Sequence, residues 1–113
     1  MRYALLISSD ESAEISAEEY SARLAAYTAF SDEMRARGVL QDGGLRLQPT
    51  ATATTVQVRQ GDVVIADGPF AETKEQIAGL YLAECKDLDE ALEVAAKIPG
   101  AAYGTIEVRP VWE

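Results

Sequence analysis

Two segments of this chain, residues 2–8 and 77–85, are apolar on both of the faces that a β-strand presents. In the first of them, RYALLIS, the central side chains are apolar whether they fall on the odd or the even face. Strands of this kind lie in the middle of a sheet and are covered on both sides. The pattern constrains the fold strongly, because the chain has to find a cover for each face.

Only two segments have the periodicity of amphipathic helices. Residues 16–37 repeat apolar side chains at helical spacing and begin with Ser16 and Glu19, which have the spacing of a capping box. Gly38 can take the left-handed cap at the end of this helix. Asp87 is placed to cap the second helix, LDEALEVAAK, which Pro99 and Gly100 end.

The remaining segments complete an α+β domain that spans residues 1–113. VLQDGGLRLQP predicts a short, interrupted strand, TATTVQVRQGDVVIADG predicts a hairpin that turns at Gly61, and YGTIEVRPVWE predicts the last strand. Thr73 and Gln76 predict one helical turn between the hairpin and the next strand. Without the hairpin the order is β-α-β…β-α-β, the split βαβ or ferredoxin-like pattern.

Two helices can cover only one face of such a sheet. The second apolar face of the strands at 2–8 and 77–85 then needs a cover that this chain does not supply. A second copy, packed sheet to sheet, is the economical solution. We therefore expect a homodimer.

Charge and cysteine content set the expected surroundings. The net charge is −9 and the ten basic residues form no cluster along the chain, which argues against a nucleic-acid partner. A single cysteine, Cys85, fits a reducing compartment. No segment approaches the ~20 apolar residues of a membrane span. We expect a cytoplasmic protein with no membrane partner.

The chain has no histidine. This absence removes Ser-His-Asp and Cys-His arrangements and histidine metal sites, so we expect no metal and no cofactor. Any acid–base chemistry has to come from Asp, Glu, Tyr, Lys, Cys or a bound cofactor.

Asp67, in the run DGPFAETKE, is the candidate catalytic residue. Asp-Gly before Pro is typical of a sharp turn, and a carboxylate at a strand end can also act as a base or a ligand anchor. Both roles stay open, and they are compatible. Phe70 in the same run is expected to be a core side chain.

Five further residues are candidates for ligand binding. Glu107 and Arg109 share one face of the last strand, as either a solvent-facing ion pair or a charged pair in a cavity. Tyr3, Tyr27 and Tyr81 lie on core elements and become pocket donors if Arg109 or Asp67 is close. Cys85 is expected to be a buried, unreactive side chain.

The stretches LQPTATATTVQVR, DGPFAETKEQIAGLYL and IEVRPV resemble the YCII-related family in its DGPF-containing branch, over nearly the whole chain. The resemblance implies a dimeric α+β barrel and a gene neighbourhood that often includes an extracytoplasmic-function sigma factor. Some members carry a histidine on the first helix, paired with an aspartate and suggested as catalytic. The corresponding stretch here, residues 27–30, reads YTAF, so that pair is absent.

Three functions compete at this point. The first is a homodimer that binds a small molecule in a barrel cavity, as an accessory to sigma-factor stress signalling. The second is a cofactor-independent enzyme, resembling isomerases, lyases or monooxygenases, that acts on a small anionic substrate through Asp67. The third is a purely structural dimer. A structure that shows which cavity contains Asp67 or Arg109 discriminates among them.

Overall fold

The computed structural model describes residues 1–113. Along the chain it has β1 (Arg2–Ser9), α1 (Ala17–Ala36), β2 (Leu45–Arg46), β3 (Thr54–Arg59), β4 (Asp62–Asp67), β5 (Gln76–Glu84), α2 (Leu88–Lys97) and β6 (Thr105–Pro110). Short 3₁₀ turns occupy Thr50–Thr52 and Pro99–Ala102. The two long helices and the strands expected from periodicity and capping are therefore confirmed, most of them with ends that differ by one to three residues. The exception is the strand expected over 39–49, of which only Leu45–Arg46 and an isolated bridge at Leu40 form.

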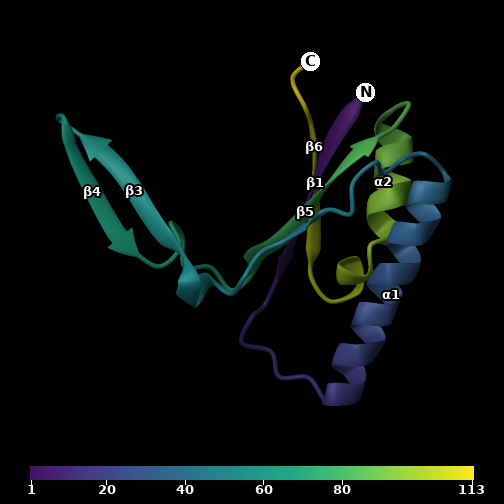
Figure 1. The fold of residues 1–113 in the computed structure, drawn as a ribbon, viewed down its shortest axis with the longest axis horizontal. Helices are drawn as coiled ribbons and strands as arrows, with labels where there is room; N and C mark the ends of the chain where they lie inside the picture. Colours follow the sequence, from purple (N-terminus) through teal and green to yellow (C-terminus); the bar gives the residue numbers. More distant parts are fainter.

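Four strands form an antiparallel sheet in the order β2-β5-β1-β6. β1 lies between β5 and β6, which explains why its side chains are apolar on both faces (Figure 1). When the hairpin is set aside, β1, β2, β5 and β6 are the first to fourth strands of a ferredoxin-like fold, in the order 2-3-1-4 across the sheet. The expected α+β, ferredoxin-like class is confirmed.

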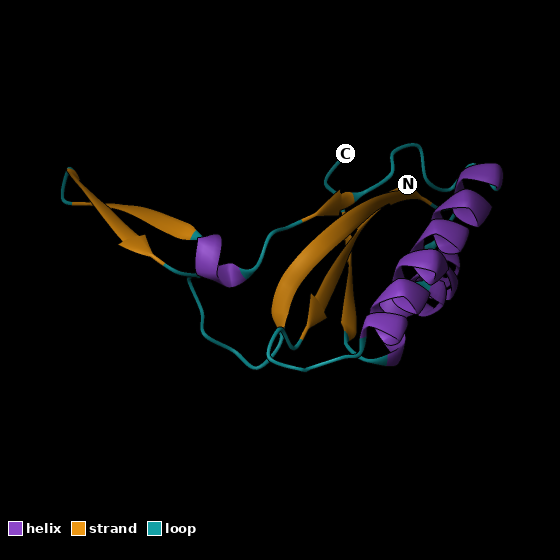
Figure 2. Cartoon of the chain, turned by 60° about the horizontal axis from the view of Figure 1, so that its bottom comes forward, coloured by secondary structure: helices purple, strands orange, loops and turns teal.

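Both helices pack on the same face of this sheet, and the core lies between them and the strands (Figure 2). Tyr3, Leu5 and Ile7 of β1 are buried there, because alternate residues of a strand point to one face. Phe30 and Met34 of α1 pack into the same cluster. The rest of the cluster comes from β5, α2 and the residues that flank α1, β5 and α2: Val39, Leu40, Tyr81, Ala83, Cys85, Ala91, Val94, Ala95 and Ile98.

The other face of the sheet, which we call the open face, is bare in the single chain. Leu6 and Leu80 pair across β1 and β5 at its centre, and both are half-buried. Leu82 beside them is 43% exposed. Glu107 and Arg109 of β6 lie on this same face, since Glu107 pairs with Leu6 across the sheet. The open face thus has an apolar centre and a charged border.

The β3–β4 hairpin projects away from the rest of the molecule (Figure 1). It turns at Gln60 and Gly61, both at positive φ, as a two-residue hairpin turn requires. Val56 and Ile65 pair on one of its faces and are 65% and 68% exposed. The projection raises the radius of gyration to 16.0 Å, where a compact domain of similar length has about 13 Å.

Two expectations about the segment after the hairpin are wrong. No helical turn forms at Thr73, whose hydroxyl donates to the Glu75 carbonyl while Gln76 donates to the carbonyls of Ala71 and Thr73. These local side-chain hydrogen bonds compete with helical ones and hold the segment as bends. Phe70 is no core side chain, since it is 86% exposed in the single chain.

Candidate functional site

A groove of about 820 Å³ lies between α1 and the β2 edge of the sheet, and we call it the α1–β2 groove. One wall is the face of α1 that presents Tyr20, Leu24 and Thr28. The opposite wall is β2 with the loop before it, and Tyr81 of β5 lies at the back. The α1 wall is regular structure, and the β2 wall is held by the pairing of Leu45 and Arg46 with β5.

Glycines allow the β2 wall to sit close to β5. Gly44 has φ +78, and a Cβ there would lie 2.6 Å from the ring of Tyr81. A Cβ on Gly79 would lie 2.5 Å from the carbonyl oxygen of Leu45. Neither approach is open to a residue with a side chain unless the backbone shifts. The two glycines therefore shape the side of the groove that the sheet forms.

Tyr27 and Tyr81, two of the predicted ligand-binding residues, both line the α1–β2 groove. The Gly100 amide donates to the Tyr27 hydroxyl at 3.1 Å, and burial raises the pKa of Tyr27 well above its ordinary range. The Tyr81 hydroxyl lies 3.3 Å from the Ser31 hydroxyl. The raised pKa keeps the Tyr27 phenol neutral at physiological pH, so it can take part in hydrogen bonds as a hydroxyl.

Three arginines line the same groove, although the protein as a whole is acidic. Arg23 pairs with Glu19 at 2.9 Å and stacks 3.6 Å from the centre of the Tyr103 ring. Arg35 pairs with Asp32 at 3.4 Å. The third, Arg46, has no carboxylate within ion-pair distance, and its guanidinium donates to the Tyr20 hydroxyl at 3.2 Å.

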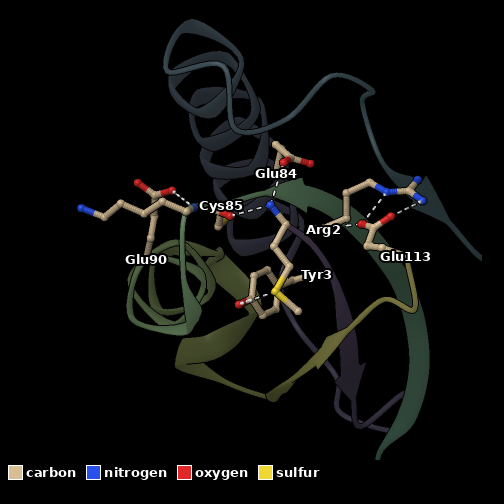
Figure 3. A network of polar contacts seen from close by, with 8 residues as sticks. Arg2, Tyr3, Glu84, Cys85, Glu90 and Glu113 are labelled. Carbon is tan, nitrogen blue, oxygen red and sulfur yellow. Dashed lines mark hydrogen bonds and ion pairs between the residues drawn. The ribbon is translucent and has the colours of Figure 1, made fainter.

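The other predicted site residues do not reach the α1–β2 groove. Tyr3 is buried in the core, where its hydroxyl donates to the sulfur of Met1 at 3.6 Å (Figure 3). Glu107 and Arg109 form an exposed ion pair with each other on the open face. The structure therefore brings Tyr27 and Tyr81 together and leaves these three residues elsewhere.

Asp67 ends β4 at the base of the hairpin, where it is exposed and pairs across the strands with Thr54. Its carboxylate accepts no hydrogen bond from the protein. The bend after it comes from Gly68, whose φ is +97 and whose amide donates to the Ala53 carbonyl at 2.8 Å. The fold therefore makes no visible use of the Asp67 carboxylate.

The rest of the DGPF run borders a second, smaller hollow of about 520 Å³. Pro69 and Phe70 line one side of it, and Leu47 and Pro49 line the other. Asp67 is not among its lining residues. This hollow lies where the hairpin joins the body, so its shape depends on how the hairpin is held.

Sequence reasoning missed Tyr20, Arg23 and Arg46. The first two lie three residues apart on α1, and Tyr27 follows four residues later, so all three share one helical face. That spacing was a usable signal for a polar aromatic stripe. Arg46 gave no such signal, because only the tertiary structure places β2 beside α1.

Two further features of the structure bear on the site. No three carboxylate or thiol side chains come together in a geometry that could hold a metal ion. Neither helix is both long enough and apolar enough to cross a membrane. The side chains that line the α1–β2 groove offer phenols, guanidinium groups, aliphatic hydroxyls, apolar surface and the two carboxylates of Glu11 and Asp32.

Comparison with known proteins places the chain in a family. The chain is similar to the uncharacterized protein R00369 of Rhizobium meliloti (strain 1021), with 48% identity over 68 residues. The match covers 58% of this chain and 55% of that protein, so it spans about half of its relative. The model of the YCII-related domain matches residues 1–113, the full length described here. The chain therefore belongs to the YCII-related family.

Proposed function

We propose that this protein binds a small molecule in the α1–β2 groove and works as a homodimer in the cytoplasm. The observation that carries the proposal is the composition of the groove, where aromatic rings, apolar side chains and guanidinium donors line one volume of about 820 Å³. Ligand sites combine an apolar lining with a few placed polar groups in this way, and such volumes suit small organic molecules.

The polar groups of the groove favour binding over acid–base catalysis. The Glu11 carboxylate accepts hydrogen bonds from the amide and the hydroxyl of Thr50, at 3.0 and 2.6 Å. The other carboxylate, that of Asp32, is paired with Arg35. Both carboxylates therefore already have partners within the protein, whereas Arg46 and the phenols can still donate hydrogen bonds to a ligand.

The homodimer is supported by the open face. Leu6, Leu80 and Leu82 form an apolar centre that would face water in a single chain. Packing two open faces together removes this area from water, which is worth roughly 25 cal/mol per Å² of apolar surface. The resulting pair of facing sheets would be the dimeric α+β barrel, with Glu107 and Arg109 at its inner border.

The pathway in which the ligand matters is proposed from the family resemblance. Related proteins are often encoded beside extracytoplasmic-function sigma factors, so a ligand-binding accessory of such a signalling system is the role we infer. Co-expression of the chain with a genome-adjacent sigma factor, followed by pull-down, tests a physical link. A physical link requires co-elution that survives salt washing.

Native mass spectrometry of the gently purified protein tests ligand binding directly. The expected spectrum shows a dimer with a small-molecule adduct, and Leu24→Glu on the groove wall is expected to remove the adduct. Leu92→Glu, on the exposed side of α2, introduces the same charge outside the groove and serves as the control. An adduct that persists in the Leu24 variant would place the ligand outside the α1–β2 groove.

A second candidate function, a cofactor-independent enzyme that uses Asp67, rests on one observation. The Asp67 carboxylate is exposed and unused by the fold, so its charge is available for chemistry. Asp67→Asn keeps the shape and removes the base. Stability should change by less than about 0.5 kcal/mol, as at other exposed sites. Turnover of any identified substrate should fall if Asp67 is catalytic, and unchanged turnover would exclude that role.

A further inference from the structure

The charge balance inside the α1–β2 groove differs from that of the whole protein. The chain carries nineteen acidic and ten basic residues, yet three arginines and only two carboxylates line the groove. The two carboxylates are occupied, Glu11 by Thr50 and Asp32 by Arg35. Glu19 neutralises Arg23 and Asp32 neutralises Arg35, while Glu11 keeps its charge because Thr50 is neutral. The groove is thus less acidic than the protein as a whole, and one of its guanidinium groups has no carboxylate partner.

Arg46 is the arginine of the groove that no carboxylate contacts. Arg23 and Arg35 are each paired with a carboxylate of α1, whereas Arg46 contacts only the hydroxyl and, at 6.0 Å, the ring of Tyr20. A guanidinium has five N–H donors, and one of them is used here. The remaining donors can meet a carboxylate, sulfonate or phosphate in the paired geometry that arginine favours.

The position of Arg46 is fixed by the sheet. Its backbone pairs with Gly79 of β5, so its side chain emerges on the face that carries the helices. The hydrogen bond to Tyr20 then draws the guanidinium across to α1. The Arg46 guanidinium is therefore held at the groove by the sheet and by Tyr20, and does not extend freely into solvent from the edge of the sheet.

The rest of the lining is suited to the body of an organic molecule. Ile15 and Leu24 are 39% and 43% exposed on the helix side of the groove, and the rings of Tyr27 and Tyr81 lie deeper. Apolar surface of this kind gains from covering by an aromatic or aliphatic group. A bare inorganic anion has no apolar part, so it would leave this apolar surface in contact with water.

We infer that the α1–β2 groove selects a small organic anion, with an aromatic or aliphatic body against Ile15, Leu24 and the tyrosines and its anionic group on Arg46. The inference rests on the proposed function, since it names the class of ligand for the same groove. It assigns Arg46 the role of specificity-determining residue.

Two fluorescent probes test the inference on the full chain. Anilinonaphthalene sulfonate carries an anionic group on an aromatic body, and phenylnaphthylamine has the same ring system without the sulfonate. The parent protein is expected to bind the sulfonate more tightly, and that preference should shrink at high salt because ions screen exposed charges. Arg46→Gln is expected to weaken sulfonate binding about tenfold, as for a lost charged hydrogen bond.

Matched variants separate the possible outcomes. Arg46→Gln should leave the affinity for the neutral probe within twofold, and Arg59→Gln, on the hairpin, removes an equal charge without affecting either probe. Equal effects of the two arginine variants, or no effect of Arg46→Gln, would overturn the choice of an anion. Leu24→Glu should weaken both probes. If it weakens neither, the groove is not the binding site and the proposed function fails with the inference.

Discussion

Among single residues, Gly44 does most to shape the α1–β2 groove. Its φ of +78 is unfavourable for any residue with a side chain, and the ring of Tyr81 fills the space that a Cβ would need. Gly38 provides a natural comparison, because its φ is +74 and nothing lies within 4 Å of a Cβ there. Substituting each of these two glycines therefore separates the cost of the left-handed backbone, which both share, from the cost of steric overlap, which only Gly44 has.

Gly44→Ala should therefore destabilise the fold more than Gly38→Ala. The backbone term is about 1–2 kcal/mol for both, since each places a side chain in the left-handed region. Overlap with Tyr81 should add about 1–3 kcal/mol at Gly44 alone. Urea denaturation of the two variants measures the difference. Equal midpoints would show that Tyr81 moves aside freely.

Cys85 predicts a dependence of stability on alkaline pH. The thiol is 2% exposed, and burial raises its pKa above the ordinary value. The folded state then holds a proton that the unfolded state loses, so the free energy of unfolding should fall as pH rises past about 8.5.

Urea denaturation at pH 7.5 and 9.5 checks this expectation. Cys85→Ala should lose less stability between the two pH values than the parent, even though it starts from a lower stability because packing is lost. The remaining alkaline loss is assigned chiefly to the amino terminus, whose pKa is raised by its hydrogen bond to Glu84, and to a smaller extent to Tyr27, whose pKa is raised in the same direction. Identical losses in parent and variant would mean that Cys85 is not the group responsible.

Two tyrosines of the site, Tyr27 and Tyr81, were predicted from the sequence, whereas Tyr20 and the arginines were not. Tyr27 and Tyr81 stand out because they are polar aromatics on segments expected to form the core. Arg46 is one of ten basic residues that form no cluster along the chain. Only the pairing of β2 with β5 places it beside the groove. Charge clusters built from distant elements leave no local pattern in a sequence.

At the scale of elements, local chemistry accounts for most of the fold. The N-cap of α1 is an example, since the Ser16 hydroxyl accepts the Glu19 amide at 3.0 Å, as the S-x-x-E spacing predicts. The Glu19 side chain pairs instead with Arg23 on the next turn, so only half of the capping box forms. The spacing predicts where the helix begins but not how its side chains choose partners.

Ser16→Ala should lower stability by about 1 kcal/mol, the usual cost of a lost N-cap. Ser16→Asp should keep the cap and add a charge that favours the positive end of the helix dipole. Thermal and urea unfolding followed by circular dichroism measures both. If Ala and Asp behave alike, the cap does not contribute to the stability of the folded protein.

The segment after the hairpin shows where such local prediction fails. Thr73 and Gln76 have the spacing of a helix start, yet their side chains bond to nearby carbonyls and hold bends. Phe70 reads as a core residue and lies exposed. Both outcomes depend on the direction in which the hairpin leads the chain. A four-residue pattern holds no information on that direction.

For the whole molecule, the main prediction concerns self-association through the open face. The parent should sediment as a dimer at micromolar concentration, and Leu82→Glu should shift it to monomer by placing charge in the apolar centre. Leu92→Glu serves as the control, because Leu92 is 49% exposed on α2, away from that face. A monomeric parent, or a Leu92 variant that also dissociates, would contradict this mode of dimerisation.

The place of β1 in the sheet also has a consequence for the kinetics of folding. β1 ends at Ser9, but its partners begin only at Gln76 and Thr105, so its pairing joins segments far apart along the chain. Such high contact order makes folding slow, because loop closure precedes any gain from pairing. The β3–β4 hairpin is local and can form within microseconds. During synthesis, β1 has to stay unpaired until β5 has emerged, which leaves an apolar strand open to association with other chains for that interval.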